Sequence, residues 1–458
     1  MTTDKLMVSV SGVRGRVGEG LTPEVITGFA SGFGAWAAAR ATGGRATIVV
    51  GRDSRVSGPM FHRAAIAGLQ SVGCDVIDVG VVPTPTVQLA VEFHHAAGGL
   101  AITASHNPIE WNALKFIAPS GLFLSAEEGA AMREATSAGI ARATWDRLGQ
   151  VTADPEAVTR HLDAILSLPY LDVEAIRQRR LHVALDCVRG AGSVIMPALL
   201  ERLGCRVTAI NLEPDGRFPH APEPIAANLA DLEALVRTSH ADVGFAVDPD
   251  VDRLALIDER GRAIGEDYTL ALAASVVLQR QKGPVVTNLS TSRIVDDIAA
   301  EAGVPVIRAP VGEVHVAIRM RAEGAPVGGE GNGGVIVAGL HLGRDAPAGA
   351  ALILQLLTDS GGATLSAVTG RWPRYAIVKD KLDRPAGSLD RIYDTLRSAF
   401  PGATVDLQDG LRLTWPDSWL HVRPSGTEPI VRVIAEAPTD ARARELVARA
   451  RAPLDAMR

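Results

Sequence analysis

The amino-acid sequence predicts an α/β protein with three similar α/β domains, whose sheets are mixed and mostly parallel, and a C-terminal α+β domain. Three observations support this fold class. The chain has 458 residues, which is too long for one ordinary core. An order of strand, polar loop, helix, glycine and strand recurs three times. This order stops near residue 371, which indicates a last domain of a different kind.

The three copies of this order begin and end on apolar strands. We expect their first strands at residues 46–50, 181–185 and 284–287, and their second strands at residues 76–79, 207–210 and 304–307. Gly73, Gly204 and Gly303 close the intervening helices. A strand that resumes directly after such a glycine is typical of βαβ units, which build parallel sheets and gather loops at the carboxyl ends of the strands.

The last part of the chain has a different order of elements. We expect a strand at residues 375–378, a helix at 389–398, strands at 404–407, 411–414, 419–422 and 430–436, and a helix at 440–450. Strands framed by two helices favour a small domain with helices packed on an antiparallel sheet. The expected domains span residues 1–152, 153–258, 259–370 and 371–458.

Composition and charge limit the classes of function. The chain is 47% hydrophobic, yet no apolar run reaches the roughly 18 residues that a membrane-spanning helix needs. A net charge of −6 argues against nucleic-acid binding. Cys74, Cys187 and Cys205 lack metal-like spacing and favour free thiols in a reducing compartment. Because the N-terminus also lacks a signal-peptide pattern, we expect a cytoplasmic protein.

A serine in a short polar loop is the first candidate for chemistry. The motif TASHNP (residues 103–108) contains Ser105 and His106 and follows an apolar run that we expect to be a buried strand. A turn with a capping serine is the alternative interpretation. Motifs elsewhere in the chain favour a chemical role for Ser105.

Three aspartates alternate with other residues at the end of an expected strand. Carboxylates as close as Asp248, Asp250 and Asp252 repel one another unless a cation lies among them. A calcium loop of the EF-hand type would need a glycine where Arg253 stands, and residues 254–257 have the pattern of a strand. We favour a Mg²⁺ site, with a solvated acidic turn as the alternative.

A glycine-rich loop and a later turn suit a phosphorylated sugar. Glu330 and Asn332 lie among five glycines at residues 328–334, where backbone could approach a polyhydroxylated ligand. A flexible loop is the alternative, and no Walker A lysine follows that would indicate a nucleotide. The later turn combines a guanidinium with hydroxyls, a combination that could bind a phosphate. A plain turn is the alternative. Its residues are Arg423, Ser425, Gly426 and Thr427, with Arg432 on the next strand.

Two further basic residues complete the candidates. Arg14 lies between glycines near the N-terminus, where it suits a phosphate facing the backbone or forms a solvated turn. Lys115 lies ten residues beyond Ser105. A half-buried lysine there could donate or accept a proton, or only extend its charged end to solvent.

The serine motif, the three aspartates, the glycine-rich loop and the later turn follow one another along the chain. In this order, these four motifs resemble those of the α-D-phosphohexomutase family, which comprises phosphoglucomutases, phosphomannomutases and phosphoglucosamine mutases. The resemblance covers essentially the whole chain. It implies four domains around a central active-site cleft. In the implied reaction, a phosphoserine gives its phosphoryl group to a hexose phosphate, and the resulting hexose 1,6-bisphosphate turns over and returns its other phosphoryl group. The implied partner is a small-molecule sugar phosphate, and the chain would be a monomer or homodimer.

The resemblance also implies a role for each candidate residue. Ser105 would carry the phosphoryl group and would join Asp248, Asp250 and Asp252 as ligands of one Mg²⁺ per chain. The other implied catalytic residues are Arg14 and Arg253, beside the transferred group, and His106 and Lys115, as candidates for general acid/base catalysis. The implied substrate-binding residues are Glu330 and Asn332 for sugar hydroxyls, and Arg423, Ser425, Gly426, Thr427 and Arg432 for the distal phosphate.

The sugar loop departs from the commonest family pattern. Asn332 stands where most members have a serine, and Gly334 stands where many have a histidine. This variant looks most like archaeal-type phosphoglucosamine mutases, so we expect conversion of glucosamine 6-phosphate to glucosamine 1-phosphate. The alternative within the family is a phosphomannomutase/phosphoglucomutase. Outside it, the alternatives are a sugar-phosphate phosphatase and a non-catalytic sugar-phosphate sensor.

Overall fold

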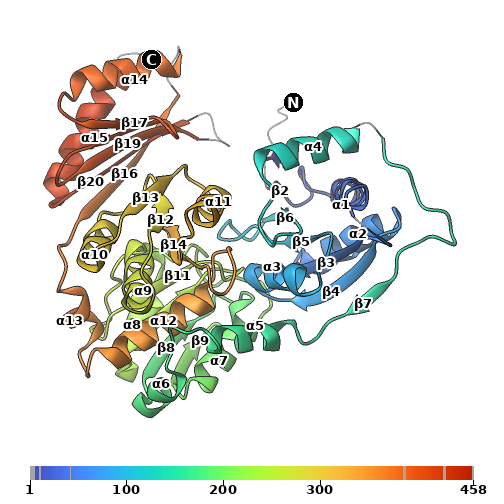
Figure 1. Ribbon diagram of the computed structural model, residues 1–458, viewed down its shortest axis with the longest axis horizontal. Helices are drawn as coiled ribbons and strands as arrows, with labels where there is room; N and C mark the ends of the chain where they lie inside the picture. Colours follow the sequence, from blue (N-terminus) through green and yellow to red (C-terminus); the bar gives the residue numbers. More distant parts are fainter. Residues whose placement is uncertain are drawn as a thin grey trace.

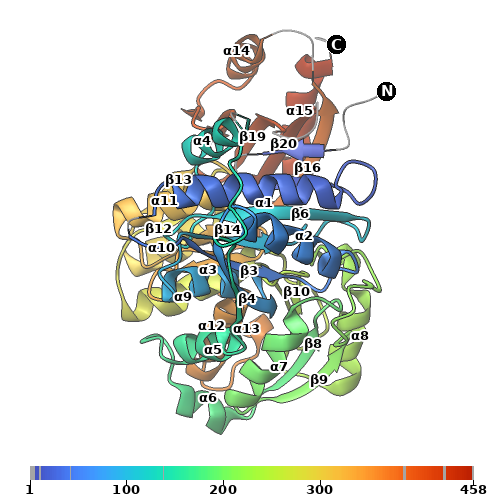
Figure 2. The same cartoon turned by 90° about the vertical axis from the view of Figure 1, so that its right-hand side faces the viewer.

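The computed structural model describes residues 6–9, 12–41, 43–137, 139–384, 388–425 and 430–455. The described strands form four sheets, which follow one another along the chain. The four units lie along an arc, from the N-terminal unit (blue) to the C-terminal unit (red) (Figure 1). In the view turned by 90°, the second unit (green) lies below the first unit, and the C-terminal unit lies above the first unit (Figure 2).

The first unit has a seven-stranded sheet of order β1-β2-β6-β5-β3-β4-β7. Its strands are β1 (Leu6–Val8), β2 (Gly12–Arg16), β3 (Thr47–Arg52), β4 (Asp75–Val81), β5 (Gly98–Ile102), β6 (Trp111–Ile117) and β7 (Val151–Ala153). Its helices are α1 (Pro23–Ala38), α2 (Gly58–Gln70), α3 (Thr84–Phe93) and α4 (Ala126–Ser137). Strands β4, β3 and β5 are parallel, whereas β6 is antiparallel to β5.

The second and third units each have a four-stranded sheet, of orders β11-β10-β8-β9 and β13-β12-β14-β15. The second contains α5 (Ala157–Leu166), α6 (Val173–Arg179), β8 (His182–Asp186), α7 (Gly192–Arg202), β9 (Arg206–Ile210), the 3₁₀ helix η1 (Ala226–Asn228), α8 (Ala230–Ser239), β10 (Val243–Val247) and β11 (Leu254–Ile257). The third contains α9 (Asp267–Arg280), β12 (Val285–Asn288), α10 (Ile294–Ala302), β13 (Val306–Ala309), α11 (Glu313–Glu323), β14 (Val327–Glu330), β15 (Gly334–Val337), α12 (Ala346–Asp359) and α13 (Leu365–Thr369).

One hydrophobic core joins the second and third units. A single cluster of buried side chains includes Leu185 of β8, Leu272 of α9 and Leu352 of α12. Helix α12 is buried on every side over residues 346–357, as expected for a helix that is apolar all round. The two units therefore form a continuous base for the loops that they carry.

The first three sheets share one arrangement. Each has three parallel strands followed by an antiparallel fourth: β4-β3-β5-β6, β9-β8-β10-β11 and β13-β12-β14-β15. This confirms the three similar α/β units predicted from the sequence. The hairpin between the third and fourth strands contains residues 103–110, 248–253 and 331–333, respectively. The serine loop, the aspartate loop and the sugar loop thus occupy equivalent positions in three sheets.

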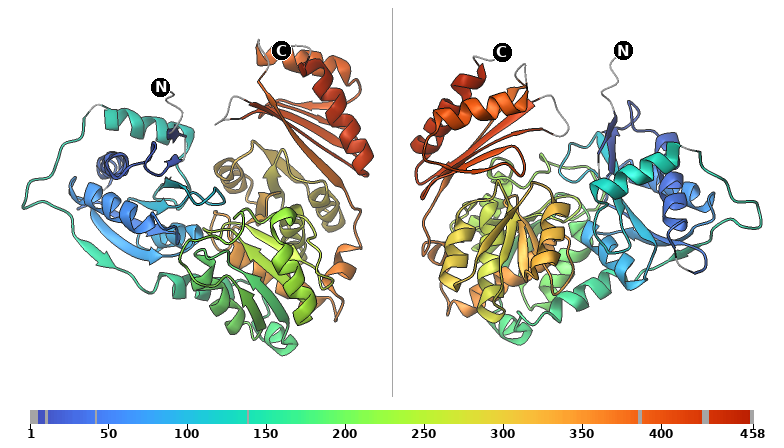
Figure 3. Two further views of the ribbon diagram at one scale, coloured as in Figure 1. Left: turned by 180° about the vertical axis from the view of Figure 1, so that it is seen from behind. Right: turned by 45° about the horizontal axis from the view of Figure 1, so that its top comes forward.

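The C-terminal unit has a fully antiparallel sheet of order β16-β20-β19-β18-β17. Its elements are β16 (Ala376–Asp383), α14 (Leu389–Ala399), β17 (Thr404–Asp406), β18 (Leu411–Thr414), β19 (Trp419–Pro424), β20 (Ile430–Ala437) and α15 (Asp440–Asp455). Both helices cover one face of this sheet (Figure 3), where Leu396 and Leu446 pack against strand residues such as Val433. The predicted C-terminal α+β unit is confirmed.

Candidate active site

Ser105 lies in the hairpin after β5 and contacts the second unit. Its Oγ donates a hydrogen bond to Asp248 Oδ2 at 2.7 Å, and its backbone N–H donates to Thr103 Oγ1 at 2.9 Å. The residue is 9% exposed and has a φ of +50°, a left-handed conformation that side chains other than glycine rarely adopt. Such a conformation persists only where surrounding contacts hold it, and it turns the serine hydroxyl toward the aspartates.

A fully buried arginine supplies much of that support. Arg55 donates to four backbone carbonyls at N–O distances of 2.6 to 2.9 Å, those of Ser105, Asn107 and Pro108 in the serine loop and that of Trp111 at the start of β6. Its Nε lies 3.1 Å from Asp53 Oδ2, which also accepts a hydrogen bond from Thr103. Sequence reasoning missed Arg55. The available signal was its place in a polar loop after β3, because β3 is the parallel neighbour of β5 and the loops after parallel neighbours meet.

Replacing Arg55 with lysine should therefore slow the reaction without greatly weakening substrate binding. A lysine keeps the charge but cannot reach four carbonyls, so the serine hydroxyl would move relative to its partners. A displacement of this kind lowers kcat by about tenfold to a hundredfold. Steady-state kinetics would show this loss with KM changed by less than about twofold, and a thermal melt would verify folding. An unchanged kcat would contradict the role.

The aspartate loop is the hairpin between β10 and β11. Asp248, Asp250 and Asp252 are buried, and one oxygen from each lies within 4.8 Å of the others. Protein donors hold each carboxylate. Asp248 Oδ1 accepts from the amides of Asp252 and Arg253, Asp250 Oδ2 accepts from Thr84 and Lys115 at 2.7 Å each, and Asp252 Oδ2 accepts from Arg344 at 2.5 Å.

The remaining oxygens of this loop fit a cation. Asp250 Oδ1 and Asp252 Oδ1 are buried and have no hydrogen-bond partner within the described part of the chain, an arrangement that is costly without a ligand. Burial raises the pKa of Asp248 well above its usual range, and the charges of Asp252 and Asp250 raise it further. A divalent cation with oxygen preference would relieve both costs.

Basic groups gather around the serine hydroxyl. Arg14 on β2 donates to Asn107 Oδ1 at 3.0 Å, and Arg253 donates to Glu223 at 3.3 Å. The ring Nδ1 of His106 lies 3.3 Å from Ser105 Oγ. Burial and then the charge of Arg253 lower the pKa of both Arg14 and His106, that of His106 to about 2. The positive charges of Arg14 and Arg253 would favour an anion at this position.

The charged end of the Lys115 side chain, on β6, contacts the aspartate loop. Burial alone would lower its pKa, but the charges of Asp250 and Asp252 outweigh burial, so its pKa is raised. Its Nζ donates to Asp250 Oδ2 at 2.7 Å. The Lys115 ammonium is thus paired with a buried carboxylate, whereas the lowered pKa of His106 favours the neutral form of its ring.

The sugar loop begins at the end of β14. Glu330 is 3% exposed, and its two oxygens accept hydrogen bonds from Asn288, Gly312 and Arg344. Burial raises the pKa of Glu330, but the charge of Arg344 and the hydrogen bonds from Asn288 and Gly312 together outweigh burial and lower it. The Asn332 side chain accepts from the amide of Gly334 at 3.2 Å. The loop is thus a hydrogen-bonded turn, with a charged carboxylate at its base.

The expected phosphate cradle lies at the end of β19. Gly426 and Thr427 lie outside the described residues, and the backbone N–H of Ser425 donates to Ile430 at 2.9 Å. Arg423 and Arg432 are direct cross-strand partners. Lys381 on β16 pairs in register with Arg432, which extends the row to three cations. Like charges directly opposite one another destabilise a sheet. Asp409 Oδ2, 3.0 Å from Arg423 Nε, offsets part of this repulsion, and a phosphate would offset it further. Sequence reasoning missed Lys381 because only strand register reveals it.

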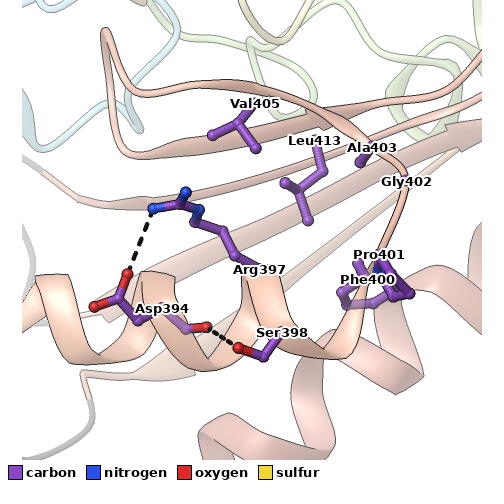
Figure 4. Close-up of a pocket in the computed structure, with 9 residues that line it drawn as sticks. All are labelled: Asp394, Arg397, Ser398, Phe400, Pro401, Gly402, Ala403, Val405 and Leu413. Atoms are coloured by element: carbon purple, nitrogen blue, oxygen red, sulfur yellow. Dashed lines mark hydrogen bonds and ion pairs between the residues drawn. The ribbon is translucent and has the colours of Figure 1, made fainter.

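The pocket drawn in Figure 4 lies apart from these residues. It has a volume of about 480 Å³ and is lined by α14 and by residues before and within β17 and β18, with an Asp394–Arg397 ion pair in its wall. None of the described candidate residues lines it.

Family models for the four domains of phosphoglucomutase/phosphomannomutase match the chain in order. The alpha/beta/alpha domains I, II and III match residues 5–142, 159–261 and 265–375, and the C-terminal domain matches residues 381–452. The chain belongs to the α-D-phosphohexomutase family. Among the described residues of this phosphohexomutase, no helix has the length and apolar character that crossing a membrane requires.

Relatives of this phosphohexomutase match it over nearly their full length. It is 39% identical to a "Probable phosphoglucosamine mutase" of Methanopyrus kandleri and 41% identical to a "Phosphoglucomutase/phosphomannomutase" of Thermococcus kodakarensis, with 95% of each chain covered in both comparisons. A crystal structure of a phosphoglucomutase/phosphomannomutase family protein from Burkholderia thailandensis has a TM-score of 0.85 and 28% identity, with 98% of each chain covered. The chain is therefore an isomerase that acts on hexose phosphates.

Proposed function

We propose that this phosphohexomutase is a phosphoglucosamine mutase, which interconverts glucosamine 6-phosphate and glucosamine 1-phosphate. A phosphoserine at Ser105 and a hexose 1,6-bisphosphate would carry the phosphoryl group between the two oxygens. The observation that supports this chemistry most directly is the 2.7 Å hydrogen bond between Ser105 Oγ and Asp248. It joins a serine in a strained loop to a buried group of carboxylates, two of whose oxygens receive no hydrogen bond from the described residues.

The phosphoryl step would use groups that already surround Ser105. The bond between phosphorus and Ser105 Oγ breaks as a sugar hydroxyl oxygen bonds to phosphorus, and the hydroxyl proton leaves to a base. Arg14 and Arg253 would hold the negative oxygens of the transferring group. Lys115 and His106 would exchange a proton at the sugar hydroxyl or at Ser105 Oγ, which the contacts of His106 with Ser105 Oγ and of Lys115 with Asp250 support.

A metal ion would complete this site. Mg²⁺ would be held by Asp248, Asp250 and Asp252 together with Ser105, and it would supply positive charge that stabilises the phosphoryl group during transfer. The two unpartnered aspartate oxygens support this assignment. The chain's own part is to orient the carboxylates, which Thr84, Lys115 and backbone amides do.

The phosphate that is not reacting needs a separate anchor. We assign this role to the turn at Arg423, Ser425, Gly426 and Thr427, with Arg432 beside it. The row of cations at Lys381, Arg432 and Arg423 supports the assignment. Glu330 and Asn332 would lie at the sugar hydroxyls between the two phosphates.

Substrate preference is the decisive test of this proposal. We expect the highest kcat/KM on glucosamine 1-phosphate when it is compared with glucose 1-phosphate and mannose 1-phosphate, each with Mg²⁺ and its bisphosphate. The support is the sugar-loop variant and the name of the Methanopyrus relative, whereas the Thermococcus relative carries the alternative name. A preference of tenfold or more for glucose or mannose would replace the proposal with a phosphoglucomutase/phosphomannomutase. Release of inorganic phosphate without isomerisation would indicate a phosphatase.

We also propose a cytoplasmic location, a monomer or homodimer, and domains at residues 1–152, 153–258, 259–370 and 371–458. The location is supported by three cysteines, two of them buried, that form no disulfide in the described structure. Light scattering on the purified chain would test the oligomeric state, and limited proteolysis would test the boundaries.

A further inference from the structure

One arginine joins the aspartate loop to the sugar loop. Arg344 follows β15 and is 8% exposed. Its Nη2 donates to Asp252 Oδ2 at 2.5 Å and its Nη1 donates to Glu330 Oε2 at 2.6 Å. Its Nε lies 3.1 Å from a third carboxylate, that of Glu313. A planar guanidinium with a fixed fork of donors can hold several carboxylates in one geometry, which an ammonium cannot do.

At the aspartate end, Arg344 determines which oxygen of Asp252 is free. The guanidinium occupies Oδ2, and Oδ1 is one of the two buried carboxylate oxygens that receive no hydrogen bond from the described residues, with Arg253 Nε 3.8 Å away. Lys115 and Thr84 do the same for Asp250. Residues that hold a ligand in this way affect metal affinity although they never touch the metal.

At the sugar end, Arg344 fixes the Glu330 carboxylate together with Asn288 and Gly312. The preceding backbone amide, that of Val311, donates to Asp409 Oδ2, which lies 3.0 Å from Nε of Arg423. Hydrogen bonds, an ion pair and adjacent backbone therefore connect the expected phosphate anchor, the sugar loop and the aspartate loop. Arg344 is the described side chain that bridges the last two.

A glycine in the variant loop makes room for this bridge. A Cβ atom added at Gly334 would lie 2.2 Å from Cδ of Arg344, which is far closer than two carbons can approach. Any side chain at this position would displace the arginine. The glycine at the position where many family members have a histidine and the buried arginine ten residues later are thus parts of one arrangement.

We propose that Arg344 is a positioning residue that couples metal binding at Asp252 to sugar-phosphate binding at Glu330. This coupling rests on the metal and sugar sites proposed above. When a sugar phosphate fixes Glu330, the shared guanidinium is fixed as well, and Asp252 is held in the orientation that leaves Oδ1 for the metal. By thermodynamic linkage, the metal strengthens sugar-phosphate binding by the same factor.

Mn²⁺ binding to the full-length, dephosphorylated chain tests this coupling without turnover. The dissociation constant would be measured by electron paramagnetic resonance or calorimetry, with and without saturating glucosamine 6-phosphate. In the unmodified chain we expect the sugar phosphate to tighten Mn²⁺ binding by about fivefold or more. In Arg344→Lys we expect about tenfold weaker Mn²⁺ binding and a coupling factor reduced to within about twofold of unity.

Two further variants separate coupling from general damage. Glu330→Gln removes the charge at the sugar end while Asp252 keeps its arginine, so it should reduce the coupling factor without a comparable loss of Mn²⁺ affinity. The double variant should lose no further coupling, because the two residues act through one contact. Arg160→Lys, which alters an ion pair with Asp154 elsewhere, is the matched control and should retain full coupling.

The outcomes distinguish this inference from the proposed function. If the unmodified chain binds no Mn²⁺, the proposed metal site is wrong and the coupling is lost with it. If the unmodified chain binds Mn²⁺ without coupling, or if Arg344→Lys keeps the unmodified affinity and coupling factor, Arg344 has no such role while the metal site stands. Should Arg344→Lys fail to fold by circular dichroism, Glu330→Gln decides: coupling that survives it overturns the inference.

Discussion

Ser105→Ala should abolish turnover, with kcat reduced by about four orders of magnitude or more. The hydroxyl of Ser105 is the group that would carry the phosphoryl group between the two sugar oxygens, and no other described hydroxyl is known to donate to Asp248. A coupled assay on a hexose 1-phosphate with its bisphosphate and Mg²⁺ measures the loss. Intact-mass analysis of the unmodified chain after incubation with the bisphosphate should show one added phosphoryl group, which the variant should not gain.

Ser275→Ala is the matched control for this experiment. Ser275 is a buried serine on α9 whose hydroxyl donates to the Leu272 carbonyl one turn earlier. Its removal should leave both turnover and phosphorylation unchanged. A Ser105→Ala variant with near-full rates, or an unmodified chain that never becomes phosphorylated, would contradict the phosphoserine mechanism.

The fold was predictable because its signals are local. A strand that ends in a polar loop, and a glycine that ends a helix, are visible within a dozen residues, as around Gly204. The antiparallel fourth strand was less visible in the first and third sheets, whereas in the second sheet residues 254–257 have the pattern of a strand. The hairpins at residues 103–110, 248–253 and 331–333 occupy equivalent positions, yet they share no sequence pattern because each one carries a different chemical group.

The candidate site was predictable where one motif holds several functional groups, as in the aspartate loop. It was not predictable where a single side chain acts across a long sequence separation. Arg55 contacts carbonyls about fifty residues later, and Arg344 contacts an aspartate more than ninety residues earlier. Neither arginine is marked by its neighbours in sequence. Every residue has a backbone carbonyl and carboxylates are common, so the sequence does not reveal the partners of these arginines. Strand register, in the same way, was needed to place Lys381 beside Arg432.

Asp250→Asn should have the second largest effect, because in the proposed site Asp250 would serve both the metal and the proton donor. Its Oδ1 is buried and receives no hydrogen bond from the described residues, and its Oδ2 accepts from Lys115 at 2.7 Å. An amide of the same shape lacks the charge that attracts a divalent cation and that raises the pKa of Lys115. We expect about hundredfold weaker Mg²⁺ binding and about a thousandfold lower kcat at ordinary Mg²⁺ concentrations, the sum of a lost electrostatic contribution and an altered proton donor.

Thermal unfolding measures the metal part of this prediction without any substrate. A ligand at a hundred times its dissociation constant stabilises a protein by about 2.7 kcal/mol, so Mg²⁺ should raise the melting temperature of the unmodified chain, and chelation should reverse the rise. Asp250→Asn should show little rise at the same concentration. Asp258→Asn is the matched control, because Asp258 is a buried aspartate at the end of the same hairpin that accepts backbone amides in a turn. It should keep the full Mg²⁺ response, and an equal loss of response in both variants would show that general disruption of the hairpin, and not loss of a metal ligand, is the cause.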